Sequence, residues 1–265
     1  MSWAEMLLVL VAGVGAGTIN TIVGSGTLIT FPVLLAVGIP PVVANVSNNL
    51  GLVPGSLSGA IGYRRELAGQ RGRILRFGVA SLLGGAAGAV ALLLLPEEAF
   101  DRIVPALILL ALVLVVLQPR LSRRLAARRE AAREEALRQG RDPRPASDHG
   151  GRLLPLGVGA CGVYGGYFGA AQGIILLALM GTALDDDLQR LNALKNVLAM
   201  IVNAVAAVVF LFVADFDWAA VALIAVGATL GGQIGSRVGR RLPPTVLRGV
   251  IVVVGLTAVG SMLLG

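Results

Sequence analysis

Apolar runs of about 20 residues recur along this chain of 265 residues and constrain its fold more than any other feature. A run of that length, wound as an α-helix, crosses a hydrocarbon core of about 30 Å. Only 14% of the residues are charged, whereas a soluble domain carries roughly a quarter. The runs do not alternate polar and apolar positions, which argues against a transmembrane β-barrel. The sequence therefore predicts an all-α, polytopic membrane protein.

The apolar runs fall into two groups of five segments. They cover residues 5–22, 27–38, 42–61, 74–95 and 103–118, then 153–168, 173–184, 191–213, 218–238 and 246–264. Between the groups, ten arginines and five acidic residues occur from Arg120 to Arg152. We therefore divide the chain into a first transmembrane repeat (1–118), a cytoplasmic Arg-rich loop (119–152) and a second transmembrane repeat (153–265). The loop sequence could form a short surface helix, and residues 141–151 are typical of a flexible linker.

The connections between segments alternate in charge. The basic ones are residues 63–76, 119–152 and 237–244, and the acidic ones are 96–101 and 214–217. Because basic loops stay in the cytoplasm, this pattern orients every segment and places both termini outside. The net charge of +7 is then explained by topology, and no nucleic-acid partner is expected. Cys161 and His149 are the only residues of their kinds, so neither a disulfide nor a metal site is expected.

The two groups are related by an internal repeat with an offset of 147 residues. The matching pairs are Asn45 with Asn192, Asn49 with Asn196, Gly84 with Gly231, Gly85 with Gly232, Gly88 with Gly235, and Pro96 with Pro243. Each group has an odd number of segments, so the second group runs through the membrane in the opposite direction. Two inverted repeats are characteristic of secondary transporters, which bind substrate near the midplane where the repeats meet.

A glycine-rich break separates the first two segments of each group. The breaks read VGSGT at residues 23–27 and YGGYFGAAQG at residues 164–173, with Gly24 roughly opposite Gly169. A short segment follows each break, which predicts broken, short helices at the repeat interface. Free N–H groups at a half-helix N-terminus favour an anion, and Ser25, Thr27 and Gln172 could add donors.

Glycines in membrane helices often only permit close packing. For the pairs Gly84 with Gly88 and Gly231 with Gly235, which have small-xxx-small spacing, we favour that interpretation. For the two breaks we favour the functional interpretation, because they occupy corresponding places in both groups.

Polar side chains at membrane depth form a second candidate feature. Asn45, Ser47, Asn48 and Asn49 begin the third segment, and Asn192, Lys195, Asn196 and Asn203 lie in the eighth. The amides could bond between helices or contact a substrate. Lys195 could bind an anion, or its ammonium could snorkel to the cytoplasmic surface. No carboxylate is evident deep in any segment, which favours an anionic substrate over a cation.

These residues carry a family resemblance. The stretch Gly15–Asn49 and its partner Gly162–Asn196 each contain a glycine-rich break, a short apolar segment and a polar helix start. In this order and duplication the chain resembles the sulfite exporter TauE/SafE family of bacterial membrane proteins. It departs from the usual run of three glycines, with GSG at Gly24–Gly26 and GAAQG at Gly169–Gly173.

The resemblance implies a transporter in the cytoplasmic membrane that exports sulfite, sulfonates such as sulfoacetate, or related sulfur oxyanions by alternating access. Carried over by position, the substrate-binding residues would be Gly24, Ser25, Gly26, Asn45, Ser47, Asn49, Gly169, Gln172, Asn192, Lys195 and Asn196. The expected partners are a small anionic substrate and the lipid bilayer, a homodimer is left open, and no cofactor is expected. The alternatives are a passive anion channel and a membrane scaffold without transport activity. A membrane enzyme is not expected, because no nucleophile–base or paired-carboxylate spacing occurs at depth.

Overall fold

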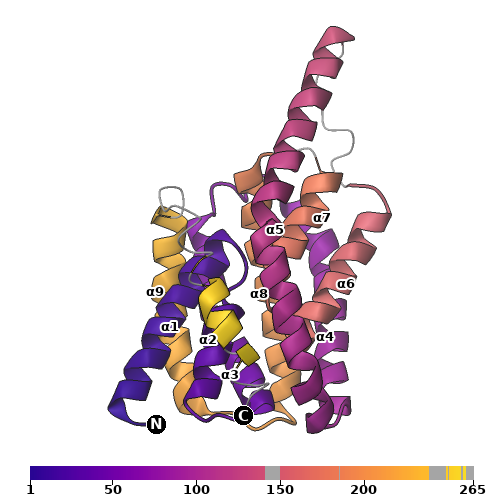
Figure 1. Cartoon of the computed structure of the whole chain (residues 1–265). Coiled ribbons are helices and arrows are strands. Elements are labelled where there is room, and N and C mark those ends of the chain that lie inside the picture. Colours follow the sequence, from indigo (N-terminus) through magenta and orange to yellow (C-terminus); the bar gives the residue numbers. More distant parts are fainter. Residues whose placement is uncertain (141–149, 185, 239–248, 250, 258, 261–265) are drawn as a thin grey trace.

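The chain folds into a bundle of α-helices, and no strand occurs in the part that the structure describes (Figure 1). The structure is a computed structural model that describes residues 1–140, 150–184, 186–238, 249, 251–257 and 259–260. The helices are α1 (Trp3–Ile22), α2 (Thr27–Ala36), α3 (Pro41–Gly62), α4 (Arg71–Leu94), α5 (Glu97–Arg138), α6 (Leu153–Tyr167), α7 (Gln172–Ala183), α8 (Leu188–Leu211) and α9 (Trp218–Val238). Residues 251–257 are also helical. The predicted all-α fold is confirmed.

Eight of the ten predicted segments agree with a helix to within three residues at both ends, the fifth does not, and the tenth (246–264) lies partly outside the described residues. The helix at the fifth segment, α5, has 42 residues and is about 63 Å long, twice the thickness of the hydrocarbon core. The arginine-rich sequence after residue 119 is helical, as the sequence allowed, but it continues α5 to Arg138 and is not a short helix of its own. Alanine, arginine, glutamate and leucine dominate this stretch, and all are strong helix formers. The predicted linker at 141–151 lies mostly outside the described residues.

Within the described residues, five helices are long and apolar enough to cross a membrane. They are α1, α4, α8, residues 98–120 of α5, and residues 218–237 of α9. The two short helices α2 and α7 have 10 and 12 residues, which correspond to about 15 and 18 Å. Neither is long enough to cross a core of about 30 Å.

The short helix α2 folds back along α1. A Cβ atom at Gly26, just before α2, would lie 2.4 Å from the carbonyl oxygen of Ala16, and the side chain of Ile29 lies beside Gly15. Residue numbers thus rise along α2 as they fall along α1. The two helices form an antiparallel hairpin that returns toward the end where α1 began.

The helices α6 and α7 form a second hairpin of the same kind. The side chain of Gln172 fills the space at Gly165, and that of Leu179 lies beside Gly157. Whether segments 27–38 and 173–184 span the membrane was open from the sequence. Both are instead the returning arms of helical hairpins.

The two halves of the chain pack mainly against each other. Helix α1 packs against α9, and its counterpart α6 packs against α4. A Cβ atom at Gly84 would lie 2.1 Å from the carbonyl oxygen of Gly159, and one at Gly231 would lie 2.1 Å from that of Val14. The packing interpretation of these glycines is therefore confirmed. The equivalent pairs fit the repeat, while its inverted orientation stays a prediction.

Connections that were predicted to be cytoplasmic meet at one end of the bundle. Arg73 and Asp186 form an ion pair there, and Arg190 binds the same carboxylate at 2.9 Å. Burial alone would raise the pKa of Asp186, but hydrogen bonds from Arg73 and the Asp187 N–H, with the nearby arginine charges, hold it below its usual value. Arg76 also donates to the carbonyl oxygen of Gly151 across 2.8 Å. In Figure 1 the N-terminus lies at the opposite end from the tip of α5.

Candidate functional site

Both hairpins turn at a glycine in the left-handed backbone region. Gly24 follows α1 with φ of +86°, and Gly169 follows α6 with φ of +78°. The N–H of Gly24 bonds back to the carbonyl oxygen of Ile19 at 3.1 Å, and that of Gly169 to Tyr164 at 3.2 Å. Glycine ends helices in this way because it lacks a Cβ atom. The sequence correspondence between Gly24 and Gly169 therefore reflects the same helix-ending turn.

The two turns touch each other in the interior of the bundle. The backbone N–H of Gly173 donates to the carbonyl oxygen of Gly24 across 3.1 Å. A Cβ atom on Gly24 would lie 2.4 Å from the Cα atom of Gly173, so no side chain fits there. The spatial neighbour of Gly24 is thus Gly173, at the start of α7. The breaks of the two halves meet at one point.

Asn45 and Asn192 bind the ends of the broken helices across the two halves. The amide nitrogen of Asn45 on α3 donates to the carbonyl oxygen of Tyr167, the last residue of α6, at 2.9 Å. That of Asn192 on α8 donates to the carbonyl oxygen of Thr21 near the end of α1 at 3.2 Å. Such carbonyls have no partner within their own helix. The two amides therefore satisfy helix ends that the breaks expose.

Lys195 is completely buried on α8 and points at the same end of α1. Its ammonium donates to the carbonyl oxygens of Asn20 at 3.1 Å and Thr21 at 3.3 Å. The amide of Asn196 also donates to Thr21, at 3.4 Å. The ammonium is therefore held inside the protein, which excludes the snorkelling interpretation. A lysine ammonium has three N–H donors, and two are used here.

Asn48 was recognised in the sequence as polar but was not chosen as a site residue. It stands 147 residues before Lys195, so the repeat offset could have marked it as the counterpart of the lysine. Its amide nitrogen donates to Thr27 at 3.3 Å, and its carbonyl oxygen accepts from Thr30. Asn48 therefore fixes the returning helix α2 to α3. The lysine makes the two halves electrically different at equivalent positions.

Several polar atoms of the predicted site are buried without a hydrogen-bond partner within the described residues. They are Ser25 Oγ, Asn49 Oδ1, Gln172 Nε2 and Asn192 Oδ1. The residues that carry them are between 1% and 7% exposed. Ser81 Oγ and Tyr167 Oη, outside the predicted site, are also without a partner. Because an unpaired buried polar atom is costly, each of these atoms is a candidate for contact with a ligand.

Ser47 lies apart from this cluster. Its hydroxyl oxygen accepts a hydrogen bond of 3.0 Å from the N–H of Asp217, in the connection between α8 and α9. The remaining predicted residue, Gly26, caps α2 beside the hairpin turn. Of the predicted set, the structure gathers the two glycine-rich turns and the α8 residues Asn192, Lys195 and Asn196, and it brings Asn45 to the end of α6.

The charges at the meeting point favour an anion. The N-termini of α2 and α7 each carry about half a positive charge, and the C-termini of α1 and α6 carry about half a negative charge each. These four partial charges cancel, so the full charge of Lys195 decides the sign. Among the described residues no Asp or Glu side chain is buried, and no group of His, Cys, Asp and Glu could hold a metal ion. With Lys195 protonated, the described part of the site is net positive.

Known proteins of similar sequence are membrane transporters by name. "Probable membrane transporter protein YfcA" of Escherichia coli (strain K12) is 26% identical over 249 residues, or 94% of this chain and 86% of the relative. "Probable membrane transporter protein" of Haemophilus influenzae is 25% identical over 255 residues, covering 94% of this chain and 91% of the relative. "Probable membrane transporter protein ORF9" of Sinorhizobium sp. is 26% identical over 246 residues, or 93% and 87% of the two chains. No solved structure matches the chain.

These names indicate a membrane transporter rather than an enzyme. With five helices able to span, the chain is a multi-pass membrane protein, which in bacteria lies in the cytoplasmic membrane. The sequence pattern described as "Sulfite exporter TauE/SafE" matches residues 9–262, which is nearly the whole chain. The protein therefore belongs to the sulfite exporter TauE/SafE family of membrane transporters.

Proposed function

We propose that the protein is a secondary transporter that exports a small sulfur oxyanion, such as sulfite or a sulfonate, across the cytoplasmic membrane. The observation that carries this proposal is the buried meeting point of two helix breaks beside the ammonium of Lys195. Half-helix termini at membrane depth are the recurring substrate site of secondary transporters. The family's description as sulfite exporters supports the choice of sulfur oxyanions.

The unpaired atoms suit such a solute. The oxygens of a sulfur oxyanion accept hydrogen bonds, which the Ser25 hydroxyl, the Gln172 amide and the third N–H of Lys195 can donate. The unpaired oxygens of Asn49 and Asn192 need donors, which a singly protonated or hydrated oxyanion supplies. A site with both kinds of group therefore discriminates oxyanions from halides, which accept hydrogen bonds but donate none.

Alternating access then consists of separating the two hairpins. The bond from Gly173 to Gly24 joins the α1–α2 hairpin to the α6–α7 hairpin, and the two come from different halves of the chain. A solute bound between them replaces that bond with its own contacts. Only the hairpin on one side needs to move for the solute to reach that side of the membrane.

The experiment is solute counterflow in proteoliposomes that contain the purified protein. We expect labelled sulfite or sulfoacetate to exchange against unlabelled solute inside, with saturation and without large unitary currents. Currents that do not saturate would show a passive channel and overturn the proposal. Absence of flux for every oxyanion and sulfonate in the panel would favour a scaffold and equally overturn it.

A further inference from the structure

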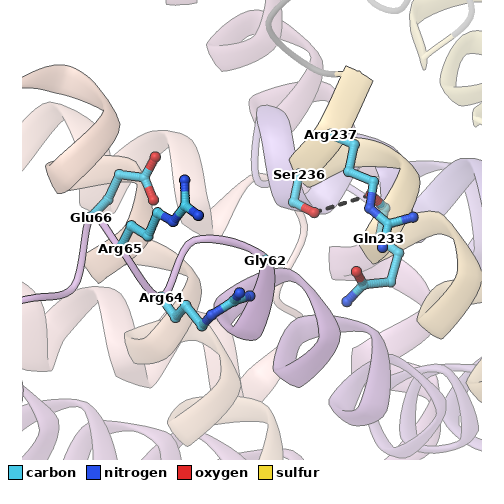
Figure 2. A pocket seen from close by; sticks show the side chains of 7 residues that line it. All are labelled: Gly62, Arg64, Arg65, Glu66, Gln233, Ser236 and Arg237. Carbon is cyan, nitrogen blue, oxygen red and sulfur yellow. Dashed lines mark hydrogen bonds between the residues drawn. The ribbon is translucent and has the colours of Figure 1, made fainter.

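A cavity of about 470 Å³ opens at the end of the bundle that carries the basic connections. One wall is the end of α3 and the turn that follows it, with Gly62, Arg64, Arg65 and Glu66. The other is the last turns of α9, with Gln233, Ser236 and Arg237. Figure 2 shows these side chains around the cavity, with the arginines of the first wall facing α9. We call this cavity the arginine pocket.

The arginine pocket is strongly positive. Three guanidinium groups and one carboxylate line it, so its net charge is about +2. No carboxylate of the described residues forms an ion pair with Arg65 or Arg237. A planar guanidinium presents paired N–H donors whose spacing matches two oxygens of an oxyanion. The chemistry of the pocket therefore fits a small oxyanion.

The floor of the pocket is formed by contacts between α3 and α9. A Cβ atom at Gly62 would lie 2.2 Å from the hydroxyl oxygen of Ser236, so α3 and α9 are in direct contact there. The amide of Gln233 donates to both oxygens of Ser58 at 3.0 Å, which fixes α9 to α3 one turn deeper. Packing and hydrogen bonds therefore close the inner end of the pocket in this conformation.

The arginine pocket lies next to the layer that holds Lys195. One turn below Gly62, a Cβ atom at Gly59 would lie 2.6 Å from the hydroxyl oxygen of Thr21. A Cβ atom at Gly235 would lie 3.0 Å from the Cβ atom of the same threonine. The carbonyl oxygen of Thr21 is the one that binds the Lys195 ammonium. One helical turn corresponds to about 5 Å along the axis. The pocket and the Lys195 layer are therefore about one turn apart along α3, and the contact between Gly62 and Ser236 must open for an anion to pass inward.

We infer that the arginine pocket is the cytoplasmic capture site of the transporter, where a small oxyanion is concentrated before it enters the site at Lys195. This inference rests on the proposed transport function. A positive cavity with low-dielectric walls raises the local concentration of an anion and its rate of entry. Arg64, Arg65 and Arg237 are exposed, so each contact is weak and the anion is passed on rather than retained.

The test is the double variant Arg65→Gln with Arg237→Gln, reconstituted in vesicles whose protein orientation is known. We expect the KM for flux from the cytoplasmic face to rise about tenfold, with maximal rate within about twofold, because capture is lost while the central site is intact. The KM from the outer face should not change. Added salt should weaken wild-type entry more than entry in the variant.

The matched control is Arg71→Gln with Arg124→Gln, which removes the same charge from exposed positions at the same end of the bundle, outside the pocket. Equal KM changes in the two double variants would overturn the inference, since only bulk charge would then matter. If the wild type transports the anion and the pocket variant has an unchanged KM, the capture site alone is overturned. If the wild type shows no flux, the transport function is overturned.

An anionic lipid headgroup is the competing occupant of a basic pocket on this side of the membrane. The same rates are therefore measured in phosphatidylcholine vesicles with and without phosphatidylglycerol. A KM increase in both lipids supports capture of the solute. A defect that appears only when phosphatidylglycerol is present would assign the pocket to lipid and overturn the inference.

Discussion

Gly173 donates its backbone N–H to the carbonyl oxygen of Gly24 across 3.1 Å, and each glycine occupies the space where the other's side chain would stand. This contact joins two helical hairpins that are about 150 residues apart in the sequence. Because both partners are backbone atoms, the contact can be opened without leaving a charged or bulky group behind. That property suits a contact that must form and break during a transport cycle.

Gly24→Ala tests how much the contact matters. The substitution forces alanine into φ of +86°, at a cost of about 1–2 kcal/mol, and adds a Cβ atom 2.4 Å from Gly173. Gly38→Ala is the matched control, since Gly38 has φ of +85° and open space around it. We expect the midpoint of thermal unfolding in detergent to fall further for Gly24→Ala, with flux abolished. Equal shifts for the two variants would show that the turns do not press together.

Lys195→Met separates stability from transport. Methionine fills similar volume without charge, and the carbonyl of Thr21 keeps the amides of Asn192 and Asn196 as donors. The substitution removes a buried charge, which is favourable, but leaves the carbonyl of Asn20 without its donor, which is unfavourable, so the unfolding midpoint should change little. Anion flux should fall at least about tenfold, because a charge at 4 Å contributes about 4 kcal/mol at an effective dielectric constant of 20. Full flux in a folded variant would contradict the role of the ammonium.

The two cross-half amides should differ in their effect on stability. Asn45→Ala removes a donor from the carbonyl of Tyr167, and we expect a loss of about 1–3 kcal/mol. Asn192→Ala leaves the carbonyl of Thr21 with Lys195 and Asn196, so the loss should be smaller. Chemical denaturation of the two variants in detergent measures the difference. A larger loss for Asn192→Ala would contradict this account of the helix ends.

Stability should depend on pH through Asp186. Its pKa is lower in the folded protein than in the unfolded chain, so the unfolded state binds the proton more readily. The stabilisation is complete well above the unfolded-state pKa of about 4 and is lost as the pH falls through that value toward the folded pKa. Asp186→Asn removes this dependence. We expect the unfolding midpoint of the wild type to approach that of the variant between about pH 5 and pH 3; parallel curves would contradict the prediction.

The fold was largely predictable because a helix that crosses the hydrocarbon core must be long and apolar. Apolar length located the helices, and paired glycines located the breaks at Gly24 and Gly169. The offset of 147 residues linked Asn45 to Asn192, which perform equivalent hydrogen bonding. The continuation of α5 was missed because Pro119 follows the apolar run, yet the helix passes through this proline into a sequence of helix formers.

The details of the site were less predictable, because its central partners are backbone atoms. The carbonyl oxygens of Asn20 and Thr21 accept hydrogen bonds from Lys195, but the residue types Asn and Thr give no indication of this role. Ser47 lies on α3 between Asn45 and Asn49, yet its hydroxyl oxygen accepts a hydrogen bond from the connection before α9. The arginine pocket joins positions 64–66 to 233–237, and no local pattern brings those segments together.

Because the helices of each half pack mainly against the other half, the order of synthesis affects how the protein folds. Helix α1 is synthesised before α9, its main neighbour, and the glycine-lined side of α4 is synthesised before α6, which covers it. During synthesis the early helices must therefore reside in lipid with their closest-fitting surfaces uncovered. A chain that stops after α5 therefore lacks the main packing partners of α1 and α4 and is an incomplete assembly rather than a smaller working unit.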